Sequence, residues 1–597
     1  KETYCGFLKR CKHYVIIGGS DVVVGIVKEI FKKEEKKHCL PYILIQTSQD
    51  VEDFRRKLFS DLKTKEQKHI IIHYGNRNSE SDIKQLHLKK ASELYIIGEE
   101  SRTDDMESYH DTMNMKCLDL VYKEVEKISH FKKIENENKE TISDNRLLCR
   151  FMFEYQTTFN VFQYSEISDR IKERINFKPF HYYEMWAQKV LVCKTLDHTA
   201  NYEYLPLEGE SGIRKDDDDY VHLVVVGMTR MGTALATQAA LMAHYPNFVT
   251  KGKRTKITLI DENADKEKNF YIDRYDRLFA LSNWSYKEMV RSESGADKLE
   301  TVFTHTPVEH DYLGGDFLDV EWEFIQGTVA QLKLQKYIEE CAIKSRKMTI
   351  AICKDEPSRC LAAALNLEWR IYENVLQVLV YNRYDDALVE QLHFKNKPKF
   401  KLSDGNELME KESKQNTRRN IISPFGNKLK AFGMASECYC EEILRDSERL
   451  VGEFENVYSG GKRREPQKLT DYWSNVYASN TMWTKFRCVE LKSGAISSED
   501  IGILAKVEHN RWVIEKLIMS YRHLSKEEHE KAKQCSLKHE VYKRNMAHRD
   551  ICSNKILRDM VGENGTNDER FIRKLVEIKQ EFDRYKNDGS RDNSTAC

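Results

Sequence analysis

The hydrophobic positions of the N-terminal third follow the alternation of strands and helices that is typical of α/β proteins. Apolar runs at 13–19 and 41–48 predict strands, and apolar residues at helical spacing lie between them. "KHIIIHYG" and "SELYIIGEE" continue the series, and "RLLCRFMF" (146–153) is expected to add an edge strand. Because strands and helices alternate, we predict a doubly wound parallel sheet.

The same pattern begins again after a charged segment, "EGESGIRKDDDDY" (208–220). "YVHLVVVGMTRMG" predicts a strand and a glycine turn, and "TKITLIDENADK" predicts a second strand that ends on acidic residues. Three later runs complete the predicted sheet: "VEWEFIQGT", "KMTIAICKD" and "ENVLQVLVYNRY". The repetition indicates an internal duplication, so the fold class is α/β with two tandem Rossmann-like units.

The pattern changes after Asp386, where a polar stretch is followed by helices joined by polar turns. "LKAFGMASECYC" (429–440) is expected to belong to those helices. The predicted segments are a first, degraded Rossmann unit, a second Rossmann unit, a polar linker with helices, and a mostly α-helical C-terminal domain: 1–207, 208–395, 396–468 and 469–597.

The glycine turn of the second repeat is the best candidate for nucleotide chemistry. A dinucleotide site needs glycines because the backbone must turn tightly and pyrophosphate must approach a helix N-terminus. The turn has the spacing GxTxxG, and acids that could bind ribose hydroxyls end the next strand. The candidate residues for NAD or another nucleotide are Gly227, Thr229, Arg230, Met231, Gly232, Asp261 and Glu262. Alternatively, the glycines only permit close helix-to-sheet packing.

The turn of the first repeat is more degraded. Ser20 and Asp21 follow its two glycines, and the second strand ends on Gln46 rather than an acid. An aspartate at this turn would repel pyrophosphate. We therefore expect a structural or dimerising role for this unit rather than a bound dinucleotide.

The helix predicted over "LAKVEHNRWVIEKLIMSYRH" (504–523) carries a polar group beside its apolar stripe. Glu508, Arg511, Trp512 and Glu515 are spaced three and four apart, so their side chains can pair. They predict either an exposed ion-pair strip with a half-buried tryptophan or a groove in which a planar or charged ligand stacks.

Two family resemblances rest on these motifs. The turns "YVIIGGSDVVVG" and "HLVVVGMTRMG", with "IDENAD" and "FIQGT", resemble TrkA-N/RCK domains, which regulate potassium channels and transporters. That family usually has a glycine-aspartate pair after the third strand, whereas Thr328 follows Gly327 here. The resemblance spans about residues 12–390 and implies a regulatory Rossmann protein.

The segment 469–580 resembles the RyR domain, a helical repeat named after ryanodine receptors and also found in bacterial proteins. "EHNRW" (508–512) matches its first helix, although Ser520-Tyr521 replaces a glycine-tryptophan pair and the turn at His548 lacks proline. The resemblance implies a ligand groove formed by Glu508, His509, Arg511, Trp512, His548 and Asp568. Bacterial proteins that combine both families resemble nucleotide sensors, some in antiphage defence, and certain members carry an N-terminal membrane part.

Composition narrows the possible partners. The 597 residues contain 96 basic and 96 acidic side chains, so no bulk charge favours a nucleic-acid duplex. The 15 cysteines show no CxxC pair, which favours reduced, intracellular thiols over metal sites; the nearest pair is Cys438 and Cys440. No apolar run reaches the roughly 18 residues of a membrane helix, and the chain starts at Lys1 without methionine, which leaves room for an upstream membrane segment.

The sequence therefore predicts a cytoplasmic, non-catalytic regulatory protein that binds a nucleotide-type ligand and changes the assembly state of a homo-oligomer. If a channel-like segment precedes Lys1, that change would gate it. The first alternative is an NAD(P)- or nucleotide-dependent oxidoreductase or hydrolase, although no Tyr/Lys or Lys/His pair is evident in the sequence. The second alternative is a scaffold that binds no ligand.

Overall fold

The computed structural model describes the chain in segments, which form two compact units. Unit 1 comprises 1–186 and 433–475, and unit 2 comprises 187–432 and 476–597. The domains expected from the sequence are continuous, whereas both units are discontinuous. The described residues are 12–34, 40–99, 107–135, 141–154, 171–192, 204–291, 297–308, 310–384, 428–439, 451, 469–490, 496–534, 546–561 and 566–592.

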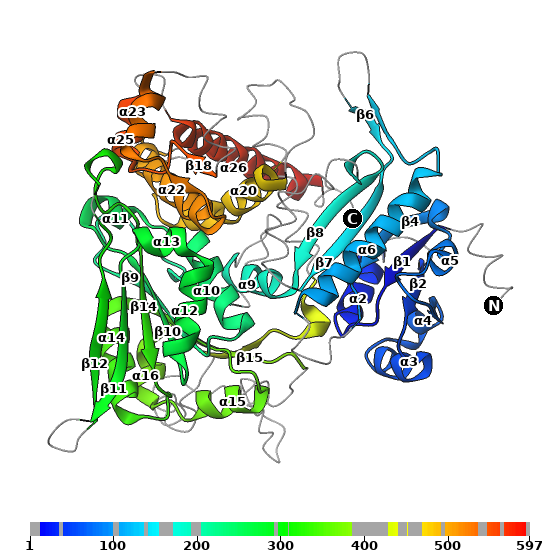
Figure 1. Cartoon of the computed structure of the whole chain (residues 1–597), viewed down its shortest axis with the longest axis horizontal. Coiled ribbons are helices and arrows are strands. Elements are labelled where there is room, and N and C mark those ends of the chain that lie inside the picture. The colour runs from blue at the N-terminus through cyan, green and yellow to red at the C-terminus, as the bar shows by residue number, and fades with distance from the viewer. Residues whose placement is uncertain are drawn as a thin grey trace. The chain divides into compact units, whose positions relative to one another are not determined.

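Unit 1 contains a six-stranded sheet in which all neighbouring strands are parallel, in the order β3-β2-β1-β4-β7-β8. This is the strand order of doubly wound dinucleotide-binding folds. The strands, seen in Figure 1, are β1 (His13–Ile17), β2 (Tyr42–Thr47), β3 (Ile70–Tyr74), β4 (Ala91–Ile96), β7 (Leu147–Phe153) and β8 (Ile175–His181).

One strand of unit 1 lies elsewhere than the sequence predicted. The run 146–153 forms β7, but β7 pairs with β4 on one side and β8 on the other, so it is not an edge strand. The prediction was wrong because β8, "INFKPFH", has a lysine and a proline that weaken its apolar signal. The helices that connect the strands include α2 (Val23–Glu34), α3 (Val51–Ser60) and α6 (Glu107–Glu126).

Unit 2 repeats this order in an eight-stranded sheet, β12-β11-β13-β10-β9-β14-β15-β16. The doubly wound α/β fold is thus confirmed for both units. Among the described strands of this sheet, only β11 and β12 pair antiparallel, so the sheet is mixed rather than purely parallel. The strands are β9 (Tyr220–Val226), β10 (Thr255–Asp261), β11 (Trp284–Arg291), β12 (Asp297–His305), β13 (Val320–Gln326), β14 (Arg346–Ile352), β15 (Gln377–Tyr381) and β16 (Leu429–Phe432).

Two elements of this sheet differ from the sequence prediction. The β11–β12 hairpin was not predicted, and it extends the sheet beyond β13. Leu429–Phe432 was expected to be helical but forms β16, which pairs with β15. A four-residue strand carries too little periodicity to be recognised alone, and here its partner strand determines its conformation.

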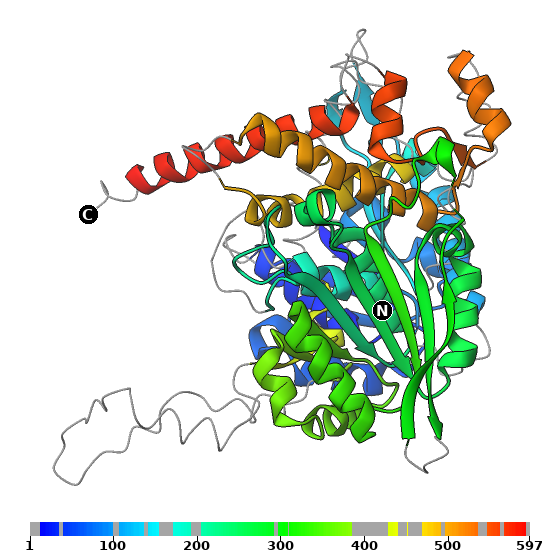
Figure 2. The ribbon, with the colours of Figure 1, turned by 90° about the vertical axis from the view of Figure 1, so that its left-hand side faces the viewer.

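The C-terminal region of unit 2 is helical, as predicted, and packs against three helices that accompany the sheet. Its main helix α22 (Ser498–Ile518) contacts α10 (Arg230–Met242), α11 (Pro246–Lys251) and α13 (Asp276–Leu281). We call this region the helical module; Figure 2 shows it across one end of the strands. Its other helices are α21 (Met482–Arg487), α23 (Lys526–Gln534), α25 (Asn554–Val561) and α26 (Asn567–Asp592).

Polar contacts identify the end of the sheet that the helical module covers. Arg487 pairs with Glu208 at 2.8 Å, and Lys215 pairs with Glu499 at 2.7 Å. Glu208 and Lys215 precede β9, and Leu313, whose carbonyl oxygen accepts a hydrogen bond from the amide of Ser553, precedes β13. The module therefore covers the amino-terminal ends of the strands.

No helix within the described ranges has both the length and the hydrophobicity that a membrane crossing requires.

Candidate functional site

The second glycine turn follows β9 at the carboxyl-terminal edge of the sheet. Gly227 has φ +105°, and a Cβ there would lie 2.5 Å from the carbonyl oxygen of Cys353. A Cβ on Gly232 would lie 2.1 Å from the carbonyl oxygen of Gly227. Both positions therefore exclude side chains for reasons of packing, with or without a ligand.

Thr229, which stands where the family pattern has a second glycine, begins helix α10. Its hydroxyl accepts a hydrogen bond from the amide of Gly232 at 3.3 Å and donates one to the carbonyl oxygen of Cys353 at 2.6 Å. The threonine is thus the N-cap of α10 and ties the turn to the end of β14.

Asp261 is engaged by the turn itself. Its Oδ2 accepts a hydrogen bond from the amide of Met228 at 2.8 Å, and its Oδ1 accepts one from the amide of Asn263 at 2.8 Å. A carboxylate has about four lone-pair positions. Asp261 can therefore hold the turn in place and still accept hydrogen bonds from a ribose hydroxyl.

Cationic side chains stand on both sides of the turn. Arg230 occupies the first turn of α10 and is partly exposed, whereas the side chain of Met231 is buried, so Met231 could offer a ligand only its backbone. Lys354 follows β14 and pairs with Glu262 at 2.8 Å, and this hydrogen bond lowers the pKa of Glu262. Together with the positive end of α10, these groups favour an anion near the turn.

Sequence reasoning missed Lys354, although a signal was present. The predicted strand "KMTIAICKD" ends on Lys354 and Asp355, and β14 lies beside β9 in the sheet. Because carboxyl ends of parallel strands share one edge, the residue after β14 had to lie near the glycine turn.

The polar group of α22 is buried rather than an exposed strip. Glu508 and Arg511 are each 1% exposed. Arg511 donates to Glu508 at 2.8 Å and to Glu515 at 2.7 Å, and Lys485 of α21 pairs with Glu508 at 2.8 Å. Burial alone would raise the pKa of Glu508, but the charges of Arg511 and Lys485 hold it below its usual value. Each of these charges therefore has an opposite charge beside it within the helical module.

His509 joins three parts of the helical module. Its Nδ1 lies 3.2 Å from Oδ2 of Asp568 in α26, and its Nε2 lies 2.8 Å from the carbonyl oxygen of Cys552. Its ring stacks beside Trp512, whose own ring meets His548 edge-on with centroids 4.8 Å apart. The residues predicted for the groove thus do meet, but Glu508, His509 and Arg511 lie in the interior.

Trp512 and Tyr521 form a half-buried aromatic edge of this group, and the buried Lys516, which the sequence analysis did not select, lies against them. Lys516 Nζ lies 5.6 Å from the ring centroid of Trp512 and 5.9 Å from that of Tyr521. The same ammonium pairs with Glu515 at 2.8 Å. A planar ligand at the helical module would meet the half-buried rings of Trp512 and Tyr521 rather than the buried ion pairs.

The two groups of candidate residues lie at opposite ends of the sheet in unit 2. The glycine turn follows β9, whereas the helical module covers the ends from which the strands start. Helix α10 spans the distance, about 20 Å for its 13 residues, and packs against α22. One helix therefore connects the turn with α22.

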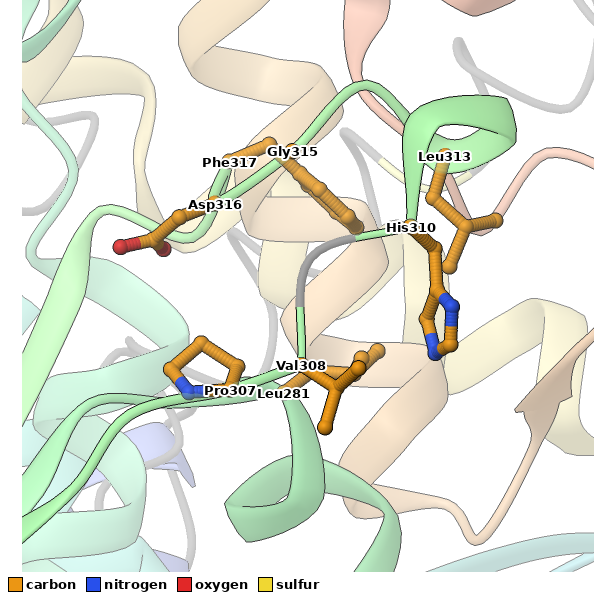
Figure 3. Close-up of a pocket in the computed structure, with 8 residues that line it drawn as sticks. All are labelled: Leu281, Pro307, Val308, His310, Leu313, Gly315, Asp316 and Phe317. Atoms are coloured by element: carbon orange, nitrogen blue, oxygen red, sulfur yellow. The ribbon is translucent and has the colours of Figure 1, made fainter.

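A small hollow lies on the loop between β12 and β13, at the end covered by the helical module (Figure 3). Its lining is largely apolar, with His310 and Asp316 as the polar members. Asp316 is engaged by Arg254 at 2.8 Å and Asn283 at 2.7 Å. The hollow is therefore lined by groups that hold the loop together.

No three or more histidine, cysteine or acidic side chains gather within the described ranges in a way that could hold a metal ion. Of the two closely spaced cysteines, Cys438 is buried, and Cys440 lies outside the described residues.

No family model and no curated protein matches the chain. Among solved structures, the crystal structure of the GsuK RCK domain is similar, with 10% sequence identity and a TM-score of 0.29. The similarity covers 64% of this chain and 72% of that chain.

Proposed function

We propose that this chain is a ligand-sensing regulatory protein of the TrkA-N/RCK-like kind, with an RyR-like helical module. It binds a nucleotide-type molecule at the second glycine turn. The ligand changes the packing of the helical module and thereby the assembly state of a homo-oligomer.

The observation that carries this proposal is the course of α10. This helix begins at Thr229, where a phosphate would be held, and it packs against α22 at the far end of the sheet. A ligand that favours one position of α10 would shift the population of arrangements of α22. Asp261, Arg230 and Lys354 supply ribose and phosphate contacts in this reading.

An enzymatic alternative has one observation in its favour. Tyr337 of α14 (Leu332–Ser345) accepts a hydrogen bond from Lys287 at 2.9 Å and donates one to Glu323 at 2.7 Å. Such a pair could serve proton transfer. However, this group lies far from the glycine turn. Lys256, which pairs with the same Glu323, stands five residues before Asp261 on β10, about 16 Å from the turn. That separation favours binding over hydride chemistry at the turn.

The proposal is tested with the full chain by thermal shift and calorimetric titration with NAD, ATP, AMP and cyclic oligonucleotides, followed by size-exclusion chromatography with light scattering. A ligand selective for the folded state raises the melting temperature. We expect Lys354→Ala to weaken binding, and Lys298→Ala, which removes an exposed lysine of β12, to leave it unchanged.

Stoichiometric binding without turnover, accompanied by a change of molar mass, supports the regulatory function. Product formation from any of these nucleotides would instead favour the enzyme. Absence of binding to all of them would leave the scaffold as the better description.

A further inference from the structure

The first glycine turn contains a carboxylate in the position where a Rossmann unit holds phosphate. The amide of Gly19 donates a hydrogen bond to Oε2 of Glu99 at 3.0 Å. The hydroxyl of Thr47 donates to the same oxygen at 2.9 Å, and the amide of Ser48 donates to Oε1 at 2.8 Å. Three donors from two strand ends thus converge on one carboxylate.

The two turns of the chain use equivalent amides for different acids. Gly18 and Gly227 both have positive φ and both donate to a carbonyl of the neighbouring strand, at 2.8 and 2.7 Å. In unit 2 the next amide binds Asp261, which belongs to the second strand of the fold. In unit 1 the next amide binds Glu99, which follows the fourth strand. The carboxylate of Glu99 therefore crosses the crevice between the first and fourth strands, where ligands of this fold lie.

Two basic side chains, Arg77 and His110, lie beside Gly98, the residue before Glu99; the other ring nitrogen of His110 faces Asp111 at 3.1 Å and Glu154 at 3.7 Å. Arg77, which is 9% exposed, lies next to Gly98: a Cβ on Gly98 would stand 2.4 Å from its Nη1 and 2.3 Å from Nε2 of His110. Arg77 donates to Asn114 at 2.7 Å, and Glu99 is among the negative charges that act on it. His110 is 4% exposed, and its Nε2 has no hydrogen-bond partner in the described part of the chain.

We propose that unit 1 contains an anion site that is closed by Glu99, and that a phosphate-bearing ligand binds there by displacing this carboxylate. The donors of Gly19, Thr47 and Ser48 and the positive charge of Arg77 suit a phosphate oxygen as well as a carboxylate oxygen. The proposal departs from the structural or dimerising role expected from Asp21. That aspartate accepts a hydrogen bond from the Ser20 hydroxyl at 3.2 Å and is partly exposed, so solvent screens its repulsion of a phosphate. Glu99 follows a glycine with φ +86° and is itself only partly buried, so it can leave without unpacking the sheet. The site is separate from the one proposed in unit 2.

The test measures binding of inorganic pyrophosphate and AMP to the full chain. Glu99→Ala opens the site, and we expect it to raise the affinity for both probes by about tenfold. Glu99→Gln keeps a neutral acceptor and should give a smaller gain. Glu126→Ala removes an exposed glutamate at the end of α6 and is the matched control, with no gain expected.

Three further measurements decide the location and the chemistry. Adding Arg77→Ala to Glu99→Ala should abolish the gain, whereas adding Lys354→Ala should leave it intact because Lys354 belongs to unit 2. Adenosine, which has no phosphate, should bind the wild type and Glu99→Ala equally.

The proposal is overturned if Glu99→Ala, with a cooperative melting transition, binds pyrophosphate no better than the wild type. It is also overturned if the gain survives Arg77→Ala, disappears with Lys354→Ala, or extends to adenosine. If Glu99→Ala raises the affinity for pyrophosphate but no nucleotide binds at the glycine turn of unit 2, only the proposed function is contradicted.

Discussion

His509 Nδ1 lies 3.2 Å from a carboxylate oxygen of Asp568, so a buried ion pair connects α22 with α26. Burial alone would lower the pKa of His509, but the hydrogen bonds to the side chains of Asp568 and Cys552, with the charge of Asp568, raise it from 6.5 to about 10. The folded chain thus holds the proton more tightly than the unfolded chain. The stabilisation that the protonated His509 gives the folded chain is complete below pH 6.5 and is lost as the pH rises through about 10.

We therefore expect the free energy of unfolding of the wild type to fall between about pH 7 and pH 10. Asp568→Asn removes the charge that raises this pKa, so the difference between the two proteins should shrink over the same interval. Urea titrations of both proteins at several pH values measure this difference in the free energy of unfolding. A difference that stays constant with pH would show that His509 is neutral in the folded chain.

Glu508 is the carboxylate shared by Arg511 and Lys485 inside the helical module. Glu508→Gln leaves two buried cations with less compensation, and we expect a loss of about 3–5 kcal/mol in stability. Glu80→Gln breaks the pair of Glu80 and Lys84, whose side chains are more than half exposed, and should not shift the melting temperature measurably. Equal shifts for both variants would contradict the buried network.

The spacing of residues along α22 predicts one part of this network. Glu508–Arg511 and Arg511–Glu515 are pairs three and four residues apart on one helix, and the sequence predicts that they can meet. The sequence gives no indication that these side chains are buried, because their partners come from other helices: Lys485 pairs with Glu508, and Asp568 pairs with the neighbouring His509. Tertiary packing brings these partners together, and no local pattern encodes it.

The fold was easier to predict than the site for a related reason. Several parallel strands such as β9 are mostly apolar, since both faces of the sheet are covered, and this makes them recognisable in the sequence. The β11–β12 hairpin, with "WSYKEMVR" in its first strand, lacks such an apolar run. Glu99 was overlooked because its role depends on Gly19, which lies 80 residues away in the sequence.

The buried carboxylate of Glu323 leads to a second prediction of stability that depends on pH. This carboxylate is 2% exposed and lies 3.1 Å from Lys256 Nζ and 2.8 Å from Lys287 Nζ. Burial alone would raise the pKa of Glu323, but the two lysines lower it from 4.5 to about 2. The folded state therefore favours the ionised form. The resulting stabilisation is complete above pH 4.5 and is lost as the pH falls through about 2.

Glu323→Gln should accordingly be less stable than the wild type at neutral pH, and the gap should narrow below about pH 4. Denaturant unfolding of both proteins across the acid range measures this. Lys298→Ala, at the exposed pair of Lys298 and Glu300, serves as the control and should differ little in stability from the wild type throughout this range. If the stability difference between Glu323→Gln and the wild type stays the same in acid, Glu323 does not have the lowered pKa described above.

Thr229 allows the capping role of the glycine turn to be separated from ligand binding. Its hydroxyl caps α10 and also bonds to Cys353, so Thr229→Ala should lower the free energy of unfolding by about 1 kcal/mol. Thr229→Ser keeps the hydroxyl and should restore most of that stability. If α10 transmits ligand binding to α22, Thr229→Ala should also weaken the nucleotide-induced change in molar mass, and Thr229→Ser should retain it. Thermal melts and light scattering of the three proteins check both effects. An unchanged assembly response in a clearly destabilised Thr229→Ala protein would mean that the cap supports the fold but takes no part in the signal.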